Sequence, residues 1–485
     1  MPPVGRRRSR DDRIGLSASH LASPQLPSCT RSWLLTTTIL LVLMVLSASA
    51  SSSPPRPRPF SVLKRNPTYA PLSTSHLSAF STLTDLNEIL DFTNPSSALS
   101  KLLVPRAVGS TNLTTLQTYL VDFFTDLGWH VEQDRFTAKT PIGEKRFNNL
   151  IMTHDPEATR RFVFAAHLDS KYFPTHPEDQ FIGATDSAAP CAMLMDLAKS
   201  LTPWLELRKK RILAQGGEEG RSTQAETLQI IFFDGEEAFV DWTDEDSIYG
   251  AKHLAKQWSK PSTRPSAIEN VPRTEMQRIS HFVLLDLLGA LNPYCRSFYG
   301  PTGWLYDEFA NVETKLGQAG ILWPGHQGKA YTKVAMAQEE GNPMKSFFMP
   351  RSTFGIMGKV EDDHIPFLEA GVPVVHMISV PFPTVWHTML DNVDALHLPT
   401  IKAWALIIRL VTVEYLGLDP EGGTTTVKGR KREVNVEDKA KRRNELVSCI
   451  RSDLGVRGGR ILIDMVSFLS MLFDTWSCKY SKHDR

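Results

Sequence analysis

Four short and continuously apolar runs alternate with longer segments of helical character, and this alternation constrains the fold more than any other feature of the chain. The runs lie within residues 161–170, 227–239, 281–290 and 371–380. Apolar runs of this kind are typical of strands that are buried on both faces of a parallel sheet. Residues 187–207 and 401–416 repeat apolar residues at helical spacing, the second as an amphipathic helix. We therefore predict an α/β fold, a single globular domain with a mixed, mostly parallel central sheet flanked by helices.

The segments before the first apolar run add helices and a pair of strands. Helical spacing begins near His76 and recurs in residues 83–92 and 112–129. Residues 131–154 contain two strand-like runs around the turn signal Pro141-Ile142-Gly143. Residues 208–226 are charged and rich in glycine, and we predict a mobile loop there. The domain is expected to span residues 76–418.

The N-terminus has the order of a secretory signal. Residues 1–31 are basic, residues 33–46 are apolar and uncharged, and the small residues 47–50 follow. The apolar run of about 14 residues is short for a membrane span, which needs roughly 20. With its Ser and Ala flanks it could still serve as a signal-anchor whose basic side faces the cytosol. We expect residues 32–50 to be a signal peptide or a signal-anchor, and the Ser- and Pro-rich residues 51–75 to be a linker.

Two further features bear on location. Asn112-Leu113-Thr114 is a glycosylation sequon, which has meaning only in the secretory pathway. We expect a secreted or lumenal protein, anchored in a Golgi-type membrane if the N-terminal segment is retained. Residues 419–485 are polar and basic and end in a short apolar segment. They predict a disordered extension, with contact between its apolar face and a membrane surface as the alternative.

Composition excludes several classes of protein. Lys and Arg total 54 and Asp and Glu total 53, a net charge of +1, which excludes a globally basic nucleic-acid binder and an acidic tail protein. The apolar fraction of 41% is sufficient for a sizeable core. The 5 Cys include no CxxC pair, which argues against a disulfide scaffold. A zinc site would have to be built from His and carboxylates.

Polar side chains that can bind metal follow the apolar runs. The carboxyl ends of strands in an open α/β sheet form the ligand crevice. Several carboxylates cannot all remain charged there without a compensating cation, and zinc accepts both His nitrogen and carboxylate oxygen. The residues at these strand ends and the adjoining loops are His167, Asp169, Asp186, Asp234, Glu236, Glu237, Asp286 and His387.

Each of these residues also has an ordinary structural explanation. Glu236 and Glu237 could belong to a solvated loop, Asp186 could cap a helix, and His167 and His387 could be structural. The joint placement of these groups at strand ends favours a common site.

Five segments of the chain carry a resemblance to a known family: FIGATDSAAPCAM, IIFFDGEEAF, VLLDLLGA, EDDHIPFLEAGVPVVH and PFPTVWHTMLDN. They resemble the glutaminyl-peptide cyclotransferases (glutaminyl cyclases), relatives of the zinc aminopeptidases that share their α/β fold. The resemblance spans residues 76–418. It implies conversion of an N-terminal Gln, and more slowly Glu, of peptides and proteins to pyroglutamate, with loss of ammonia or water. We expect a monomer that contacts a membrane only through the possible N-terminal anchor.

The resemblance implies a role for each matching residue. Asp186, Glu237 and His387 would bind one zinc per chain, and Glu236 would be the general acid and base. Three protein ligands leave a fourth position open, where the substrate γ-carbonyl could be polarised. Glu236 would accept the α-amine proton and later protonate the leaving ammonia. Asp286 and Asp362 would form a hydrogen-bond network beside it. The substrate pocket would be walled by Trp242, Phe382 and Trp386.

The ligand inventory leaves the metal count open. His167 and Asp286 would complete the ligand set of a two-zinc aminopeptidase, which is the alternative function on the same fold. Ser187, where those peptidases typically have a second Asp, and the VWHT segment disfavour that alternative. A non-catalytic binding module, the third possibility, predicts loss of ligands, and none is missing.

Two positions depart from the vertebrate members of the family. Their secreted members have a disulfide near the site, of which this chain has only Cys191, because Ala166 occupies the other position. We therefore expect Cys191 to be a buried thiol. Glu361 occupies a position where the vertebrate pocket usually has Gln.

Overall fold

The computed structural model describes residues 72–418, except 225, 262–273, 323–345 and 352–359. The signal-like segment, most of the expected linker and the C-terminal extension lie outside the described residues. The end of the expected linker is described, and there the Ser73 hydroxyl accepts a hydrogen bond from the His76 amide at the start of the first described helix. Among the described helices, none is both long and apolar enough to cross a membrane.

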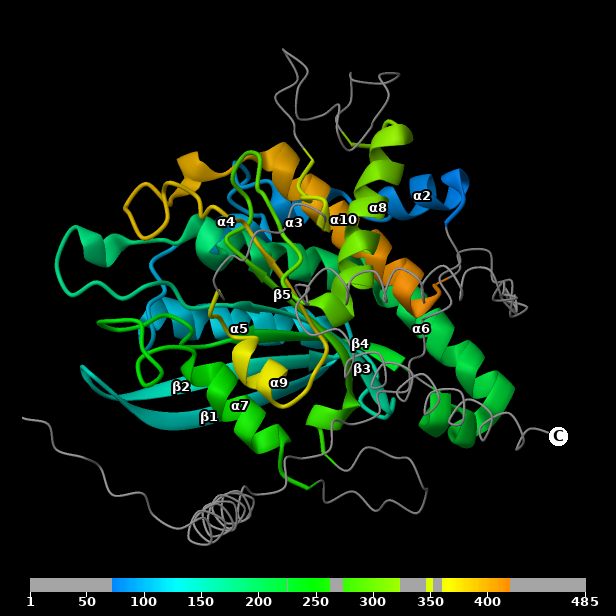
Figure 1. Cartoon of the computed structure of the whole chain (residues 1–485), viewed down its shortest axis with the longest axis horizontal. Coiled ribbons are helices and arrows are strands. Elements are labelled where there is room, and N and C mark those ends of the chain that lie inside the picture. The colour runs from blue at the N-terminus through cyan, green and yellow to red at the C-terminus, as the bar shows by residue number, and fades with distance from the viewer. Residues whose placement is uncertain (1–71, 225, 262–273, 323–345, 352–359, 419–485) are drawn as a thin grey trace, which may run out of the picture. The chain divides into compact units, whose positions relative to one another are not determined.

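A six-stranded sheet forms the centre of the domain, in the order β1-β2-β4-β3-β5-β6 (Figure 1). β3 pairs in parallel with β4 and β5, and β5 pairs in parallel with β6, whereas β2 is antiparallel to β1 and β4. The prediction of a mixed, mostly parallel sheet is therefore confirmed. The strands are β1 (His130–Thr140), β2 (Gly143–Thr153), β3 (Arg160–His167), β4 (Glu226–Phe233), β5 (Ile279–Asp286) and β6 (Val374–Ile378).

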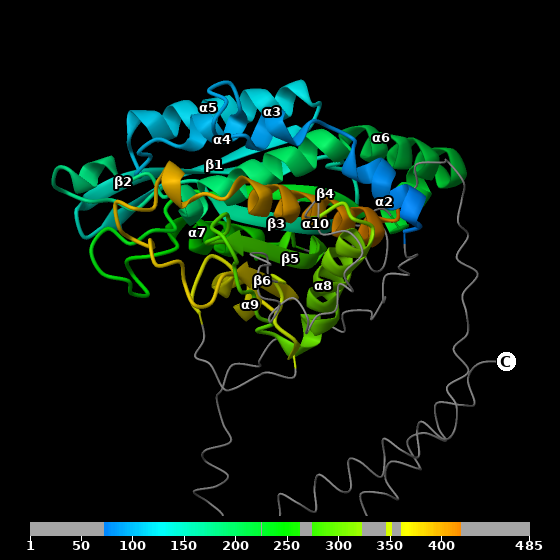
Figure 2. The same cartoon turned by 90° about the horizontal axis from the view of Figure 1, so that it is seen from above.

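Helices cover both faces of this sheet, with α6 and α10 on one side and α7 and α9 on the other (Figure 1). Figure 2 shows β4, β3, β5 and β6 following one another across the sheet. The helices are α2 (Thr74–Ser81), α3 (Leu86–Leu90), α4 (Ala98–Leu102), α5 (Thr111–Asp126), α6 (Ala189–Gln224), α7 (Tyr249–Trp258), α8 (Gly303–Gln318), α9 (Ile365–Glu369) and α10 (Leu398–Leu416).

Two apolar clusters explain why polar and apolar residues do not alternate along the central strands. Phe162 and Phe164 of β3 belong to the larger cluster, with α5, α6, α8 and α10. Val163 and Ala165 belong to the smaller cluster, with α7 and α9. Successive side chains of a strand point to opposite faces, and here both faces are covered by helices. β1 at the sheet edge instead alternates between exposed and half-buried residues, as its polar sequence requires.

Two predictions about helices need correction. Residues 208–224 are helical, because α6 continues to Gln224, so the predicted loop was wrong. Its charge and glycines suggested a loop, but residues 205–215 are mostly strong helix formers such as Leu, Arg, Lys and Ala. The helix predicted at 401–416 exists as part of α10, but it is buried almost all round rather than amphipathic, because it packs against α6 and α8.

Candidate active site

The central strands end side by side at one edge of the sheet. His167, the last residue of β3, pairs in register with Phe233, the last residue of β4. Asp286, the last residue of β5, pairs with Ile378, the last residue of β6. This register brings the loops that follow these strands together, as the sequence predicted.

Asp169 fixes the loop that carries the adjacent glutamates. Its carboxylate accepts hydrogen bonds from the backbone amides of Gly235 at 2.9 Å, Glu236 at 3.2 Å and Glu237 at 3.3 Å. The loop after β3 therefore sets the position of the loop after β4. The sequence placed Asp169 at a strand end but did not reveal this role.

The segment that carries Asp186 makes a tight turn before α6. Residues Ala184–Ala188 form a single wide helical turn whose backbone departs from helical geometry at Asp186 and Ser187. Gly183 precedes it with φ 61°, and a Cβ at this position would lie 2.2 Å from the Asp186 carbonyl oxygen. Only glycine fits here, and the turn directs Asp186 into the crevice.

The three predicted zinc ligands lie together. His387 Nε2 is 3.4 Å from Asp186 Oδ2 and 3.3 Å from Glu237 Oε1. One potential ligand atom from each of the three residues lies within 4.8 Å of the others. His387 has φ 54°, a conformation that non-glycine residues adopt rarely and mostly at functional sites. The structure therefore brings together the side chains that the sequence assigned to one metal.

The chemistry of this donor set fits zinc. Asp186 Oδ2 and both carboxylate oxygens of Glu237 are buried and accept no hydrogen bond among the described residues. The Lys171 ammonium lies 3.5 Å from Glu237 Oε2. Buried carboxylates need compensating charge, and zinc accepts both His nitrogen and carboxylate oxygen, with three protein ligands at catalytic sites.

The carboxylates raise the pKa of the histidine that faces them. Burial lowers the pKa of His387, but its contacts with the negative charges of Asp186 and Glu237 outweigh that effect and raise this pKa to about 9. Burial likewise opposes ionisation of Asp186, yet His167 and His387 lower its pKa. Because a metal ligand must be neutral imidazole, metal binding would displace the proton from His387.

His167 and Asp286 lie close to the same group. His167 Nε2 is 2.9 Å from Asp186 Oδ1 and 3.4 Å from Asp286 Oδ1. The three form a second possible metal cluster that shares Asp186. However, Asp286 Oδ1 also accepts hydrogen bonds from the Ser187 hydroxyl and, at 2.8 Å, from the Leu287 amide. These donors compete with a second metal for that oxygen.

Glu236 has the environment of a general acid and base. Its side chain is 6% exposed. Burial and the neighbouring carboxylates Glu237 and Asp362 raise the pKa of Glu236 well above its ordinary value, against the opposing effect of His167. A carboxyl group with a raised pKa can both accept and donate a proton near neutral pH.

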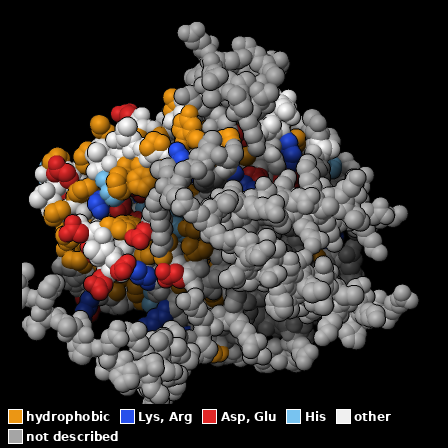
Figure 3. Space-filling model, viewed as in Figure 1, with side chains coloured by type: hydrophobic (Ala, Val, Ile, Leu, Met, Phe, Trp, Pro, Cys, Tyr) orange, Lys and Arg blue, Asp and Glu red, His pale blue; other side chains and the backbone are white. Residues whose placement is uncertain are grey.

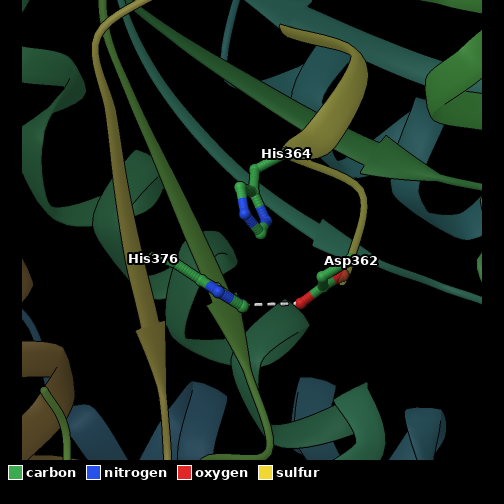
Figure 4. Close-up of side chains that lie close together, drawn as sticks. All are labelled: Asp362, His364 and His376. Atoms are coloured by element: carbon green, nitrogen blue, oxygen red, sulfur yellow. Dashed lines mark hydrogen bonds and ion pairs between the residues drawn. The ribbon is translucent and has the colours of Figure 1, made fainter. Parts of the chain in front are cut away.

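Asp362 lies beside two buried histidines, His364 and His376 (Figure 4). His376 Nε2 forms a hydrogen bond of 2.7 Å with Asp362 Oδ2, and His364 Nε2 lies 2.5 Å from the Tyr299 hydroxyl. Burial lowers the pKa of His376 to about 4, which favours a neutral ring. Burial and the nearby Asp286 raise the pKa of Asp362 well above its ordinary value.

The sequence analysis missed His364 and His376. His376 interrupts the apolar run of β6, and a polar residue inside a strand buried on both faces was the available signal. These histidines and Asp362 also satisfy the geometry of a metal cluster. The hydrogen bond with His376 holds the Asp362 carboxyl group in position.

The predicted aromatic wall is partly assembled beside the ligand cluster. The Phe382 and Trp386 rings lie 4.9 Å apart, and Trp386 stacks on His387 at 3.9 Å between ring centroids. Trp386 is 39% exposed. Trp242 is 40% exposed in the loop after β4, and no ring contact among the described residues joins it to the other two aromatic residues.

Exposed apolar side chains surround this edge of the sheet. Every large hydrophobic residue exposed in the described part of the chain lies in the segments that follow β4, β5 or β6, Val393 in a short 3-10 helix. Figure 3 shows hydrophobic side chains among acidic ones on one face. The exposed residues are Val240, Trp242, Leu291, Trp386, Leu390 and Val393.

The two described cysteines are buried free thiols, Cys191 and Cys295. Cys191 Sγ donates to the His167 carbonyl oxygen at 3.1 Å, next to Ala166. The expected buried thiol is therefore confirmed. Glu361 is exposed at the start of the segment that carries Asp362.

Comparisons with known proteins identify the family. The family model of peptidase family M28 matches residues 149–412. A glutaminyl-peptide cyclotransferase of Drosophila melanogaster is 41% identical over 320 residues, which cover 66% of this chain and 79% of that protein. A glutaminyl-peptide cyclotransferase-like protein of Bos taurus is 38% identical over 322 residues, with coverage of 66% and 74%.

A solved structure agrees with these sequence relatives. The crystal structure of Macrostomum lignano glutaminyl cyclase is 34% identical, aligns with a TM-score of 0.60, and covers 74% of this chain and 98% of its own. The residues matched by the family model include the strand-end residues described above. The chain therefore belongs to peptidase family M28 and, within it, to the glutaminyl-peptide cyclotransferases.

Proposed function

We propose that this chain cyclises an N-terminal Gln, and more slowly Glu, of peptides and proteins to pyroglutamate, with one zinc ion per chain. Membership of the cyclotransferase family supports the activity. One observation carries the site assignment: buried Asp186 and Glu237 oxygens without hydrogen bonds face His387, directly beside Glu236 with its raised pKa.

The zinc would be held by Asp186, Glu237 and His387. When bound, it leaves a coordination position open and polarises the substrate γ-carbonyl as a Lewis acid. The reaction exchanges one carbon–nitrogen bond for another. The α-amine nitrogen of the substrate forms a bond to the γ-carbon, and the bond from that carbon to the amide nitrogen breaks. A proton must move from the attacking nitrogen to the leaving one.

Glu236 handles the proton that this exchange moves. It accepts a proton from the attacking amine and returns one to the departing nitrogen, which leaves as ammonia. Its raised pKa suits both steps. The hydrogen bond between His376 and Asp362, and those from Ser187 and Leu287 to Asp286, hold two further carboxyl groups in fixed positions.

The aromatic side chains would determine how the substrate is held. Phe382 and Trp386 offer apolar surfaces beside His387, which suit a small substrate head and exclude water. Exclusion matters because water that attacked the amide would release Glu instead of pyroglutamate. Trp242 contributes a further exposed aromatic surface from the loop after β4.

Metal removal tests this proposal. Dialysis against a chelator should abolish pyroglutamate formation from a Gln-peptide, and one equivalent of zinc per chain should restore it. The donors that occupy Asp286 Oδ1 support a single zinc. A requirement for two equivalents would instead favour the aminopeptidase, which would recruit His167 and Asp286 to a second metal.

The residues outside the described structure bear on location. We propose that residues 1–31 form a basic N-region, that residues 32–50 direct the chain to the secretory pathway as a signal peptide or signal-anchor, and that residues 51–75 are a linker. Residues 76–418 would then be a lumenal or extracellular catalytic domain that acts as a monomer on peptide substrates, and residues 419–485 a C-terminal extension.

A further inference from the structure

A fully buried arginine contacts the segment that carries Asp186. Arg106, between α4 and α5, is 0% exposed. Its guanidinium donates to four backbone carbonyls: Leu168 at 2.6 Å, Gly183 at 3.0 Å, Asp186 at 3.2 Å, and Ile182. We infer that Arg106 is a positioning residue for the metal site, because it fixes the backbone from which the Asp186 carboxylate projects.

The partners of Arg106 differ from those of the other fully buried arginine, Arg409. Arg409 Nη2 lies 2.8 Å from the buried carboxylate of Asp196, which neutralises it directly. Among the ion pairs of the described residues, none involves Arg106. Its charge interacts at longer range with acidic groups of the site, including Asp186 and Asp391. The Arg106 guanidinium thus donates its hydrogen bonds to carbonyls, and the negative charge of the nearby acidic groups offsets the energetic cost of burying it.

Asp391 holds the same segment through its backbone amides, whereas Arg106 binds its carbonyls. Its carbonyl oxygen accepts from the Ala184 amide at 3.0 Å, and its Oδ1 accepts from the Thr185 amide at 2.8 Å. Asp391 lies four residues after His387 in sequence. Arg106 therefore binds the carbonyls of the turn, and Asp391 binds its amides and links it to the loop of a second ligand.

This arrangement matters because three ligands provide no redundancy. Residues that orient metal ligands typically change metal affinity by about 10–100-fold when they are mutated. The planar guanidinium reaches several carbonyls at once, whereas a lysine has one nitrogen and cannot replace that set. The inference rests on the proposed metal role of Asp186, but it concerns a residue that touches neither metal nor substrate.

The test compares Arg106→Lys with the matched control Arg409→Lys, which changes the buried arginine that is paired with a carboxylate. Zinc affinity is measured by competition with a chromophoric chelator, and the absorption spectrum is recorded after cobalt substitution. Both variants should lower the melting temperature of the metal-free protein. Only Arg106→Lys should weaken zinc binding, by about 10–100-fold, and shift the cobalt bands.

The outcomes separate the inference from the proposed function. Wild-type protein without tight zinc binding would refute the metal site itself. Tight zinc binding by wild type and Arg106→Lys alike would refute only the role of Arg106. If Arg106→Lys does not fold, Asp391→Ala decides, because it removes the acceptor of the Thr185 amide. Weakened zinc binding by Asp391→Ala supports the positioning of this turn, and unchanged binding overturns it.

Discussion

Two adjacent glutamates of this site have different tasks in the proposed mechanism. Both carboxyl groups are buried beside the same loop, which Asp169 holds through three backbone amides. The Glu237 oxygens face His387, whereas Glu236 lies near Asp362 and has a strongly raised pKa. This loop therefore places the Glu237 carboxylate where it could bind the metal and the Glu236 carboxyl group where it could transfer the proton.

We predict that Glu236→Gln abolishes cyclisation but leaves zinc content intact. Gln is nearly isosteric with Glu and cannot accept the amine proton at neutral pH. General acid–base groups contribute about 10²–10⁴-fold, so the rate of pyroglutamate formation should fall at least that far. Turnover of a Gln-peptide and elemental analysis of the same preparation measure both quantities.

Glu237→Gln is the matched comparison for that variant. It should lose zinc as well as activity, because it removes one of three ligands. Loss of zinc by Glu236→Gln with retention by Glu237→Gln would show that the two roles are reversed. Near-normal cyclisation by Glu236→Gln would mean that Asp286, Asp362 or solvent carries the proton.

The proposed roles differ in how far the sequence could predict the residues that fill them. Glu236 and Glu237 come shortly after an apolar strand, so their placement could be predicted from the pattern, whereas Asp186 and His387 lie in adjoining loops and were expected to be ligands from the family resemblance. Arg106 is about eighty residues from the turn that it binds, and nothing in its local sequence reveals this contact. His376 is similar, because its role depends on Asp362 from another segment.

At the scale of elements, the packing of α10 against the sheet includes a partly buried histidine. His281 at the start of β5 places Nδ1 2.7 Å from the hydroxyl of Tyr415 in α10. Burial lowers the pKa of His281 from 6.5 to about 4. The unfolded chain therefore binds a proton in a pH range where the folded chain does not.

This difference predicts how stability depends on pH. The contribution of neutral His281 is complete above the unfolded pKa of 6.5 and is lost as the pH falls from there toward 4. One unit of pKa difference corresponds to about 1.4 kcal/mol. His281→Gln should therefore show a smaller decrease in unfolding free energy than wild type between these pH values, measured by urea denaturation. Equal decreases in both proteins would contradict the assignment.

The strands were predictable and the helix boundaries were less so. Continuous apolar runs identified β3, β4, β5 and β6 because helices cover both faces of these strands. The length of α6 was missed, because a charged, glycine-containing segment is typical of a loop, whereas the helix continues to Gln224. Local composition does not report where tertiary packing ends a helix.

At the scale of the whole molecule, the N-terminal sequence predicts entry into the secretory pathway. Asn112 of the sequon is exposed near the start of α5, where its side-chain amide donates to the Pro105 carbonyl at 2.8 Å. Expressed with its native N-terminus, the protein should carry a glycan that Asn112→Gln removes, seen as a mobility shift on enzymatic deglycosylation. Unglycosylated full-length protein in the cytosol would reject this topology.

The proposed function requires that this member of peptidase family M28 cyclises an N-terminal Gln and does not hydrolyse peptide bonds. The most direct measurement incubates the zinc-loaded protein in parallel with a Gln-peptide and with leucine amide, and follows ammonia, pyroglutamate and free leucine. We expect pyroglutamate and ammonia in equal amounts from the Gln-peptide and no leucine from the amide. Release of leucine without formation of pyroglutamate would contradict it and identify the chain as an aminopeptidase.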